Sequence, residues 1–209
     1  MAISASRFLA IATVLTIGVQ APAWAHHMMD MVLPQTFSQG LLSGLGHPVI
    51  GIDHLAAIIG VGILAALMDR GPAVVLAFSV AMIAGVGVHL AGVSLPTGEL
   101  LVGLTTLAIG ALVILRRSMG TGLAAALFAA AGLVHGYALG ESIVGAEASP
   151  LVAYLLGLLV VQSVISLAVY GAVLALSRWP SRAMGVTAAG VLVAVAGGIA
   201  TASAAGLVG

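Results

Sequence analysis

The chain has 209 residues, of which 62% are hydrophobic and 6% are charged, and its mean hydropathy is +1.27. A soluble domain carries about 25% charged residues, so this chain has too little charge to cover a surface in water, and lipid must be its solvent. The formal net charge is zero and the chain has no lysine and no cysteine. This composition argues against nucleic acid as a partner and excludes a disulfide framework, a thiolate metal site and a cysteine nucleophile.

The first 25 residues are predicted to be a cleavable signal peptide. Arg7 precedes an apolar stretch of about a dozen residues, and Ala23 and Ala25 are the small residues at the −3 and −1 positions of a cleavage site. The apolar stretch is shorter than the roughly 20 residues that span a bilayer, which disfavours the alternative of an uncleaved first transmembrane helix. The mature chain is then expected to begin at His26.

Six apolar segments follow, and they predict an all-α fold, a polytopic membrane helical bundle that forms one transmembrane domain over residues 26–209. Each segment is near or above the length that crosses about 30 Å of hydrocarbon at about 1.5 Å per residue. Pro48 divides the first apolar region, so residues 36–47 are expected to form a short interfacial or re-entrant helix. The six predicted transmembrane helices are 48–68, 72–92, 98–115, 121–140, 151–176 and 183–206.

The charged residues support this count and predict an orientation. If the mature N-terminus lies outside, all five arginines of the mature chain fall in inner loops, whereas the outer segments contain Asp30, Glu99, Glu141 and Glu147. This distribution follows the positive-inside rule. We therefore expect a multi-pass protein of the bacterial inner membrane with a periplasmic mature N-terminus.

An acid and an imidazole are adjacent inside the first predicted span, at Asp53 and His54. An Asp in a span costs about 2.5–3.5 kcal/mol on insertion scales, so such groups usually face the bundle interior and serve a pathway. His47 precedes His54 by two helical turns, and an unbroken helix would place both on one face. Asp53 points about 100° away from His54, so it either binds a metal directly or orients an imidazole.

The fourth predicted span supplies a partner for this pair. His135 and Glu141 are expected at the depth of His54 or just above it, and Gly136 and Gly140 form a small-residue face that lets two helices approach closely. Two or three imidazoles with one or two carboxylates suit a divalent cation such as Ni²⁺, Co²⁺ or Zn²⁺. Each histidine alone is equally well explained as a hydrogen-bond partner between helices, but the set favours a role with a metal or with protons.

The outer tail and the start of the third span contain further candidate ligands. The free amine and the imidazoles of His26 and His27 can capture a transition metal, and the methionines that follow keep copper among the candidates. A tail without function is the alternative. Glu99 begins the third span, where the helix dipole alone would also favour an acid.

Three of these segments resemble motifs of a known family. His47-Pro48-x-x-Gly51-x-Asp53-His54-Leu55-Ala56 is similar to the first-helix signature of the HupE/UreJ family of bacterial nickel permeases. His135-Gly136-Tyr137-Ala138-x-Gly140-Glu141 resembles the fourth-helix motif of that family, and Pro96 with Glu99 resembles its Pro-x-x-Glu element. The resemblance implies that nickel transport, or cobalt transport in some members, is served by His47, Asp53, His54, His135, Glu141 and Glu99.

The chain departs from the family pattern in two helices. Leu139 stands where the fourth-helix motif usually has a second histidine. The fifth helix of the family commonly reads Tyr-x-x-Gly-Phe-x-x-x-Thr-x-x-x-His; Tyr154 and Gly157 match it, whereas Leu158, Gln162 and Ser166 replace its last three residues. A ligand set with fewer imidazoles implies weaker binding or a preference for another ion, so the departures bear on nickel specificity more than on metal transport.

We therefore expect a secondary permease or facilitator, and not an enzyme, that imports a divalent metal, Ni²⁺ first, from periplasm to cytoplasm. The alternatives are a Co²⁺ or copper transporter of the same architecture, an intramembrane zinc metalloenzyme and a metal-sensing membrane protein. A P-loop requires a lysine, so uptake would depend on an ion gradient, the membrane potential or proton exchange. The expected partners are the transported ion and the lipid bilayer, with no tightly bound cofactor and no nucleic acid; whether the chain forms a homo-oligomer stays open.

Overall fold

The fold is taken from a computed structural model that describes residues 33–68, 71–116 and 119–208. Within these ranges the chain forms helices and short connections and no strand, which confirms the predicted all-α class. The predicted signal peptide and the histidines at 26 and 27 lie outside the described residues. The helices are α2 (Phe37–Ile50), α3 (Ile52–Ala65), α4 (Gly71–Leu90), α5 (Gly98–Leu115), α6 (Thr121–Gly140), α7 (Ala148–Ala175) and α8 (Arg182–Ala204), with 3-10 turns η2 (Glu141–Ile143) and η3 (Leu176–Arg178).

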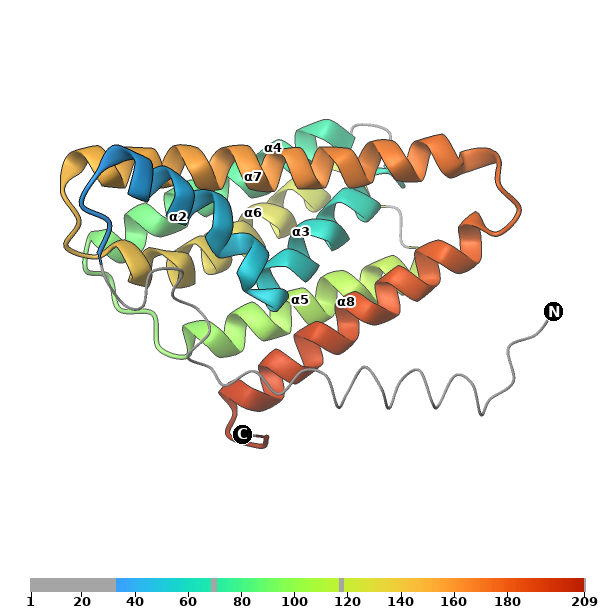
Figure 1. Ribbon diagram of the computed structural model, residues 1–209. Coiled ribbons are helices and arrows are strands. Elements are labelled where there is room, and N and C mark those ends of the chain that lie inside the picture. The colour runs from blue at the N-terminus through green and yellow to red at the C-terminus, as the bar shows by residue number, and fades with distance from the viewer. Residues whose placement is uncertain (1–32, 69–70, 117–118, 209) are drawn as a thin grey trace.

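The long helices account for the predicted membrane spans. In the described part of the chain, α4, α5, α6 with η2, α7 with η3, and α8 are each long and apolar enough to cross a membrane, and α2 with α3, bent by 79°, is a sixth if the pair counts as one span. The bent pair begins beside the start of α7 and ends beside the start of α4, at the opposite end of the bundle (Figure 1). The pair therefore crosses the bundle once, as a broken helix.

The first apolar region is divided at Gly51, so the predicted boundary at Pro48 is wrong. Gly51 has an extended backbone conformation with φ −70° and ψ 100°, and it ends α2 and begins α3. Pro48 and His47 are both helical, because the proline removes only one hydrogen-bond donor and the last turn of α2 is closed by a bond from Gly51 N–H to the His47 carbonyl (3.1 Å). The α2 helix thus continues to Ile50.

Residues 36–47, expected to form a short interfacial or re-entrant helix, form most of the short helix α2, which packs along α7. Thr36 caps the start of α2: its side chain accepts a hydrogen bond from Gln39 N–H, and the Gln39 side chain accepts one from Thr36 N–H. Gly40 and Gly44 then bring α2 so close to α7 that a β-carbon on either would overlap the carbonyl of Pro150 or Tyr154.

Three tightly packed helix pairs surround α3. They are α4 with α6, α5 with α8, and α2 with α7, and α3 runs between α7 on one side and α5 and α8 on the other (Figure 1). Ten of the 14 residues of α3 are buried, which makes this short helix the centre of the core. The predicted small-residue face of α6 is confirmed, since Gly136 contacts the backbone of Met82 in α4 and Gly140 contacts the His89 side chain.

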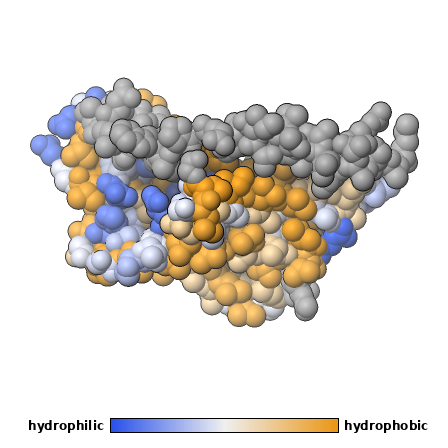
Figure 2. All heavy atoms as spheres, turned by 90° about the horizontal axis from the view of Figure 1, so that it is seen from below, coloured by the Kyte–Doolittle hydropathy of each residue, from blue (hydrophilic) through white to orange (hydrophobic). Residues whose placement is uncertain are grey.

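The outer surface is apolar in the middle and polar at its two ends. Figure 2 shows hydrophobic side chains over the central part of one face and hydrophilic ones gathered toward the ends. Arg116, Arg178 and Arg182 lie where α5 and α7 end and α8 begins, which we call the arginine end. The opposite or glutamate end carries three exposed acids, Glu99, Glu141 and Glu147.

Replacing Gly136 by alanine is expected to destabilise the bundle. The new β-carbon would overlap the carbonyl of Met82, so α4 and α6 must separate, and overpacking of this kind costs about 1–3 kcal/mol. The measurement is the temperature at which the purified protein aggregates in detergent. Gly171→Ala is the matched control, because a β-carbon there meets nothing within 4 Å; equal stability of the two variants would contradict the packing assigned to α6.

Candidate metal site

Two imidazoles from distant parts of the chain meet next to the helix break. His54 lies in the first turn of α3 and is 5% exposed, and His135 of α6 is fully buried. Their Nδ1 atoms are 2.8 Å apart and their ring planes are inclined by 73°. His135 precedes the end of α6 at Gly140 by five residues, so the pair lies about 7–8 Å below the glutamate end. We call His54 and His135 the imidazole pair.

Two threonines of α5 hold the other face of His135. Its Nε2 atom is 3.2 Å from Thr105 Oγ1 and 3.4 Å from Thr106 Oγ1. The Thr105 hydroxyl donates to the Leu101 carbonyl and the Thr106 hydroxyl to the Val102 carbonyl, so the two oxygens are left to accept from Nε2–H. We therefore assign the hydrogen of neutral His135 to Nε2.

This assignment leaves the Nδ1 lone pair of His135 directed at His54. Metal-binding histidines usually donate their second ring N–H to an oxygen in the same way, which fixes the ring and makes the free nitrogen a better ligand. Two nitrogens bound about 2.0–2.1 Å from a tetrahedral metal lie about 3.3 Å apart. The observed separation of 2.8 Å between the Nδ1 atoms therefore needs to widen by only about half an ångström.

Asp53 adds a negative charge beside the imidazole pair. Its Oδ1 atom accepts a hydrogen bond from the His54 backbone N–H at 2.8 Å, and the side chain is half-buried. The first turn of a helix favours an acid because its unpaired N–H groups carry a partial positive charge. Asp53 therefore stabilises the start of α3 and places a negative charge next to His54.

His47 lies on the other side of the break, in α2. Its Nδ1 atom is 3.5 Å from the hydroxyl of Tyr154 in α7, and its side chain is 6% exposed. The Tyr154 hydroxyl donates to the Leu139 carbonyl at 2.8 Å and contacts the Ser142 hydroxyl at 3.1 Å. An unbroken helix would place His47 and His54 on one face, but the chain bends by 79° between them, so they lie on two different helices.

The remaining predicted ligands lie farther out. Glu99 is exposed in the first turn of α5, and Glu141 is exposed just after α6. Over residues 33–68, 71–116 and 119–208, no three side chains of histidine, aspartate, glutamate or cysteine are grouped so as to hold a metal ion. The structure thus brings together His54 and His135, places Asp53 beside them, and leaves the two glutamates on the surface of the glutamate end.

His89 was assigned no ligand role from the sequence, and the structure packs it on the fourth-helix motif. Its ring centroid is 4.5 Å from that of Tyr137. The Tyr137 hydroxyl accepts from Leu95 N–H at 2.9 Å and donates to the Val93 carbonyl at 3.0 Å, which ties the α4–α5 connection to α6. Tyr137 and His89 therefore support the glutamate end above the imidazole pair.

Two of the three fifth-helix positions that depart from the family motif are buried hydrogen-bonding groups, and the third, Leu158, belongs to the hydrophobic core. Gln162 and Ser166 are fully buried; Gln162 Nε2 donates to the Ser79 carbonyl at 3.1 Å and Ser166 Oγ to the Ile58 carbonyl at 3.0 Å. These bonds join α7 to α4 and α3. These two polar side chains therefore hold neighbouring helices together. The carbonyl that Ser166 bonds, that of Ile58, lies one helical turn after His54 in α3.

Comparison with known proteins agrees with this arrangement. The model of the family described as HupE / UreJ protein matches residues 14–200. Protein HupE of Rhizobium leguminosarum bv. viciae is 34% identical over 103 residues, which are 48% of this chain and 53% of the relative, so the match spans about half the length of that relative. No solved structure matches. Since the family model covers most of the sequence, including all the residues of the helix break and of the imidazole pair, the chain belongs to the HupE/UreJ family.

Proposed function

We propose that this chain is a secondary permease that imports a divalent transition metal ion, with Ni²⁺ as the first choice, through the bacterial inner membrane. The observation that carries the proposal is the imidazole pair, whose Nδ1 atoms lie 2.8 Å apart inside an apolar bundle. Two imidazoles with a neighbouring carboxylate are a donor set suited to Ni²⁺ and Co²⁺.

The broken first span supports transport. Non-helical backbone at membrane depth occurs only where protein or a water-filled cavity satisfies its polar groups. In many transporters, discontinuous helices meet near the middle of the membrane, and the ends of their half-helices contribute to the substrate and ion sites. Here Gly51 interrupts the span, and Asp53 and His54 follow it in the first turn of α3.

Membership of the HupE/UreJ family supports the choice of cargo, because the family consists generally of nickel and cobalt transporters. The similar protein HupE is matched over about half of its length, so its activity is carried to this chain only as a proposal. The site is suited to cobalt as well as nickel, and uptake measured with both ions decides between them.

The charges at the two ends suggest the direction. With the arginine end in the cytoplasm, the positive-inside rule is satisfied and the exposed glutamates face the periplasm. An inside-negative potential then favours uptake of the ion by about 2.3 kcal/mol per charge per 100 mV. In this proposal residues 1–25 are a signal peptide, residues 26–209 form the permease, and His26, His27, Glu99 and Glu141 attract the ion before it enters.

Binding of an ion by both Nδ1 atoms would require a hydrogen to leave the contact between them at the imidazole pair. The hydrogen between the two Nδ1 atoms belongs to His54, because His135 carries its own hydrogen on Nε2 toward the threonines. An ion that binds both Nδ1 atoms therefore requires His54 Nδ1 to lose that hydrogen, and the proton moves to Nε2 or leaves. Asp53 lowers the energy of the charge that results.

Replacing His54 or His135 by alanine is expected to lower the initial rate of ⁶³Ni²⁺ uptake into cells by about tenfold or more, because each change removes one of two paired ligands. The double variant should lose little more than either single one, since both residues act on the same ion. Uptake is normalised to the amount of protein in the membrane, and His89→Ala is the control histidine. Normal uptake by His54→Ala would remove the basis of the proposal.

Replacing both Thr105 and Thr106 by valine is expected to weaken metal binding by about 10- to 100-fold, because the hydrogen-bond acceptors of His135 Nε2–H are lost while the shape is kept. The measurement is the half-saturating Ni²⁺ concentration for uptake. Thr201→Val is the matched control, since Thr201 bonds only the Gly197 carbonyl of its own helix in the described structure. An unchanged half-saturating concentration in the double variant would show that the threonines do not orient the ligand.

Purified protein in liposomes is expected to carry Ni²⁺ inward without ATP, and faster when the interior is made negative. The readout is a metal-sensitive dye enclosed in the vesicles. Vesicles without protein and vesicles with His54→Ala give the background. Binding of Ni²⁺ without flux would instead identify a metal sensor.

A further inference from the structure

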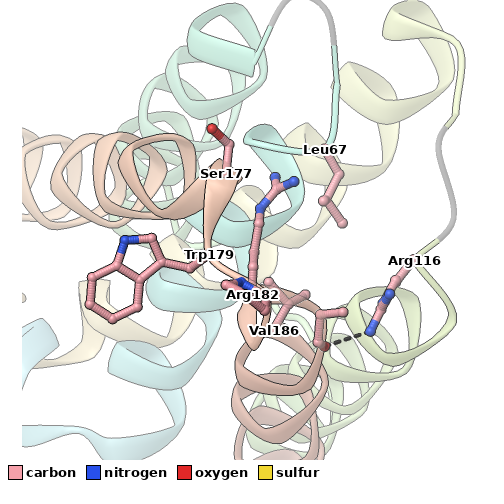
Figure 3. Close-up of a pocket in the computed structure, with 8 residues that line it drawn as sticks. Leu67, Arg116, Ser177, Trp179, Arg182 and Val186 are labelled. Atoms are coloured by element: carbon pink, nitrogen blue, oxygen red, sulfur yellow. Dashed lines mark hydrogen bonds between the residues drawn. The ribbon is translucent and has the colours of Figure 1, made fainter.

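A cavity of about 250 Å³ lies at the arginine end of the bundle (Figure 3). It opens where α7 turns through η3 into α8 and where α5 ends. Its volume is below the roughly 300–1,000 Å³ of pockets that enclose a whole small-molecule ligand, so it suits a single polar headgroup. The lining residues are Leu67, Arg116, Ser177, Trp179, Pro180, Arg182, Ala183 and Val186.

Two guanidinium groups give the cavity its positive charge. Arg116 donates from one terminal nitrogen to the Ala183 carbonyl and to Thr187 Oγ1 at 3.0 Å, which fixes that side chain against α8. Arg182 extends between Ser177 and Leu67 (Figure 3). The Nε atom of Arg182 is buried and has no hydrogen-bond partner among the described residues. Burying a charged donor without an acceptor raises the free energy of the folded protein. An anion that accepts a hydrogen bond from Arg182 Nε would remove this cost.

The sequence around the cavity is strongly basic. Among the described residues of this end, Arg116, Arg178 and Arg182 are basic, and residues 176–183 include no acid. Arg182 also begins α8, whose N-terminal end carries a partial positive charge. None of the eight described residues that line the cavity is acidic. The ligand that this environment favours is therefore an anion with several acceptor oxygens, such as a phosphate group.

The surroundings of the cavity are apolar and exposed. Trp179 is 63% exposed and Met184 is 67% exposed, and Leu176 is 41% exposed beside them. Tryptophan is enriched where proteins meet the lipid headgroups, and basic pockets between transmembrane helices bind anionic headgroups. A ligand with an anionic head and long apolar chains would match both parts of this surface, whereas free phosphate would match only the cavity.

We propose that the cavity binds the phosphodiester of an anionic phospholipid, with Arg182 and Arg116 as its cationic partners and Ser177 as a neutral one. The acyl chains then lie outside the cavity, against Trp179, Leu176 and Met184. This lipid site is independent of the metal site and fixes the turn between α7 and α8 against the end of α5.

Native mass spectrometry of the purified full-length protein tests the proposal. After addition of equal amounts of phosphatidylglycerol and phosphatidylcholine in detergent, the protein is expected to retain one phosphatidylglycerol in preference. Arg182→Gln should weaken this retention by about tenfold. Arg178→Gln is the matched control, since Arg178 carries the same charge in the same loop but does not line the cavity; it should change retention by less than about twofold.

Three results would overturn the proposal. Equal losses in Arg182→Gln and Arg178→Gln would mean that the lipid responds only to the general charge of this end. Equal retention of the two lipids would exclude recognition of the anionic headgroup. Displacement of the lipid by millimolar inorganic phosphate would identify free phosphate as the ligand.

Two further variants separate lipid binding from the effects of misfolding and from metal transport. Ser177→Ala removes one hydroxyl from the exposed rim and is expected to weaken retention by a smaller factor even if Arg182→Gln is unstable. His54→Ala should retain phosphatidylglycerol as well as the unsubstituted protein does, so loss of nickel uptake and loss of lipid binding are distinguished.

Discussion

The interruption of the first span at Gly51 is the constraint on which the rest of the bundle depends. A break exposes backbone N–H and C=O groups, and hydrocarbon offers them no partners, so the break must be enclosed by protein. The two half-helices are enclosed in different ways: α2 packs along α7, and α3 passes through the centre with ten of its 14 residues buried. Because the break is enclosed, the first turn of α3 buries His54 against α6 and leaves Asp53 half-buried beside it.

Close helix pairs then bring the second imidazole to this turn. Gly136 lets α6 contact the backbone of α4 at Met82, and small residues are the usual means of such approach in a membrane. His135 is the neighbour of Gly136 and is directed at α3 and α5, where it meets His54 and the two threonines. A contact between α4 and α6 thus fixes the position of an imidazole whose hydrogen-bond partners lie on α3 and α5. The cavity proposed to bind lipid does not involve the contact between α4 and α6. Its position is set by the turn from α7 into α8.

Much of this arrangement could be predicted from the sequence. The lengths of the apolar segments predicted the long helices, and the positions of the arginines predicted which ends of those helices lie together. The ionisable residues Asp53 and His54 inside a span predicted a partner at His135. The sequence placed the break at Pro48, because proline is the stronger local signal for the end of a helix. The break at Gly51 is set by the packing of the two half-helices on either side of it. Thr105 and Thr106 were missed because threonine is common in transmembrane helices and gives no ionisable signal. Only the packing of α5 against α6 shows that their hydroxyls meet His135.

The departures from the family motif bear on how tightly an ion would be held. At Leu139 the side chain is fully buried and the backbone carbonyl accepts from Tyr154 and Ser142, so this position contributes an oxygen to packing and no imidazole to the site. Ser166 likewise bonds the Ile58 carbonyl where the family commonly has histidine. In the proposed permease an ion would therefore have two imidazoles and its remaining waters, with Asp53 as a neighbouring negative charge. Conduction requires a site that binds the ion strongly enough to admit it and weakly enough to release it, and a small ligand set meets the second requirement at the expense of selectivity among metals.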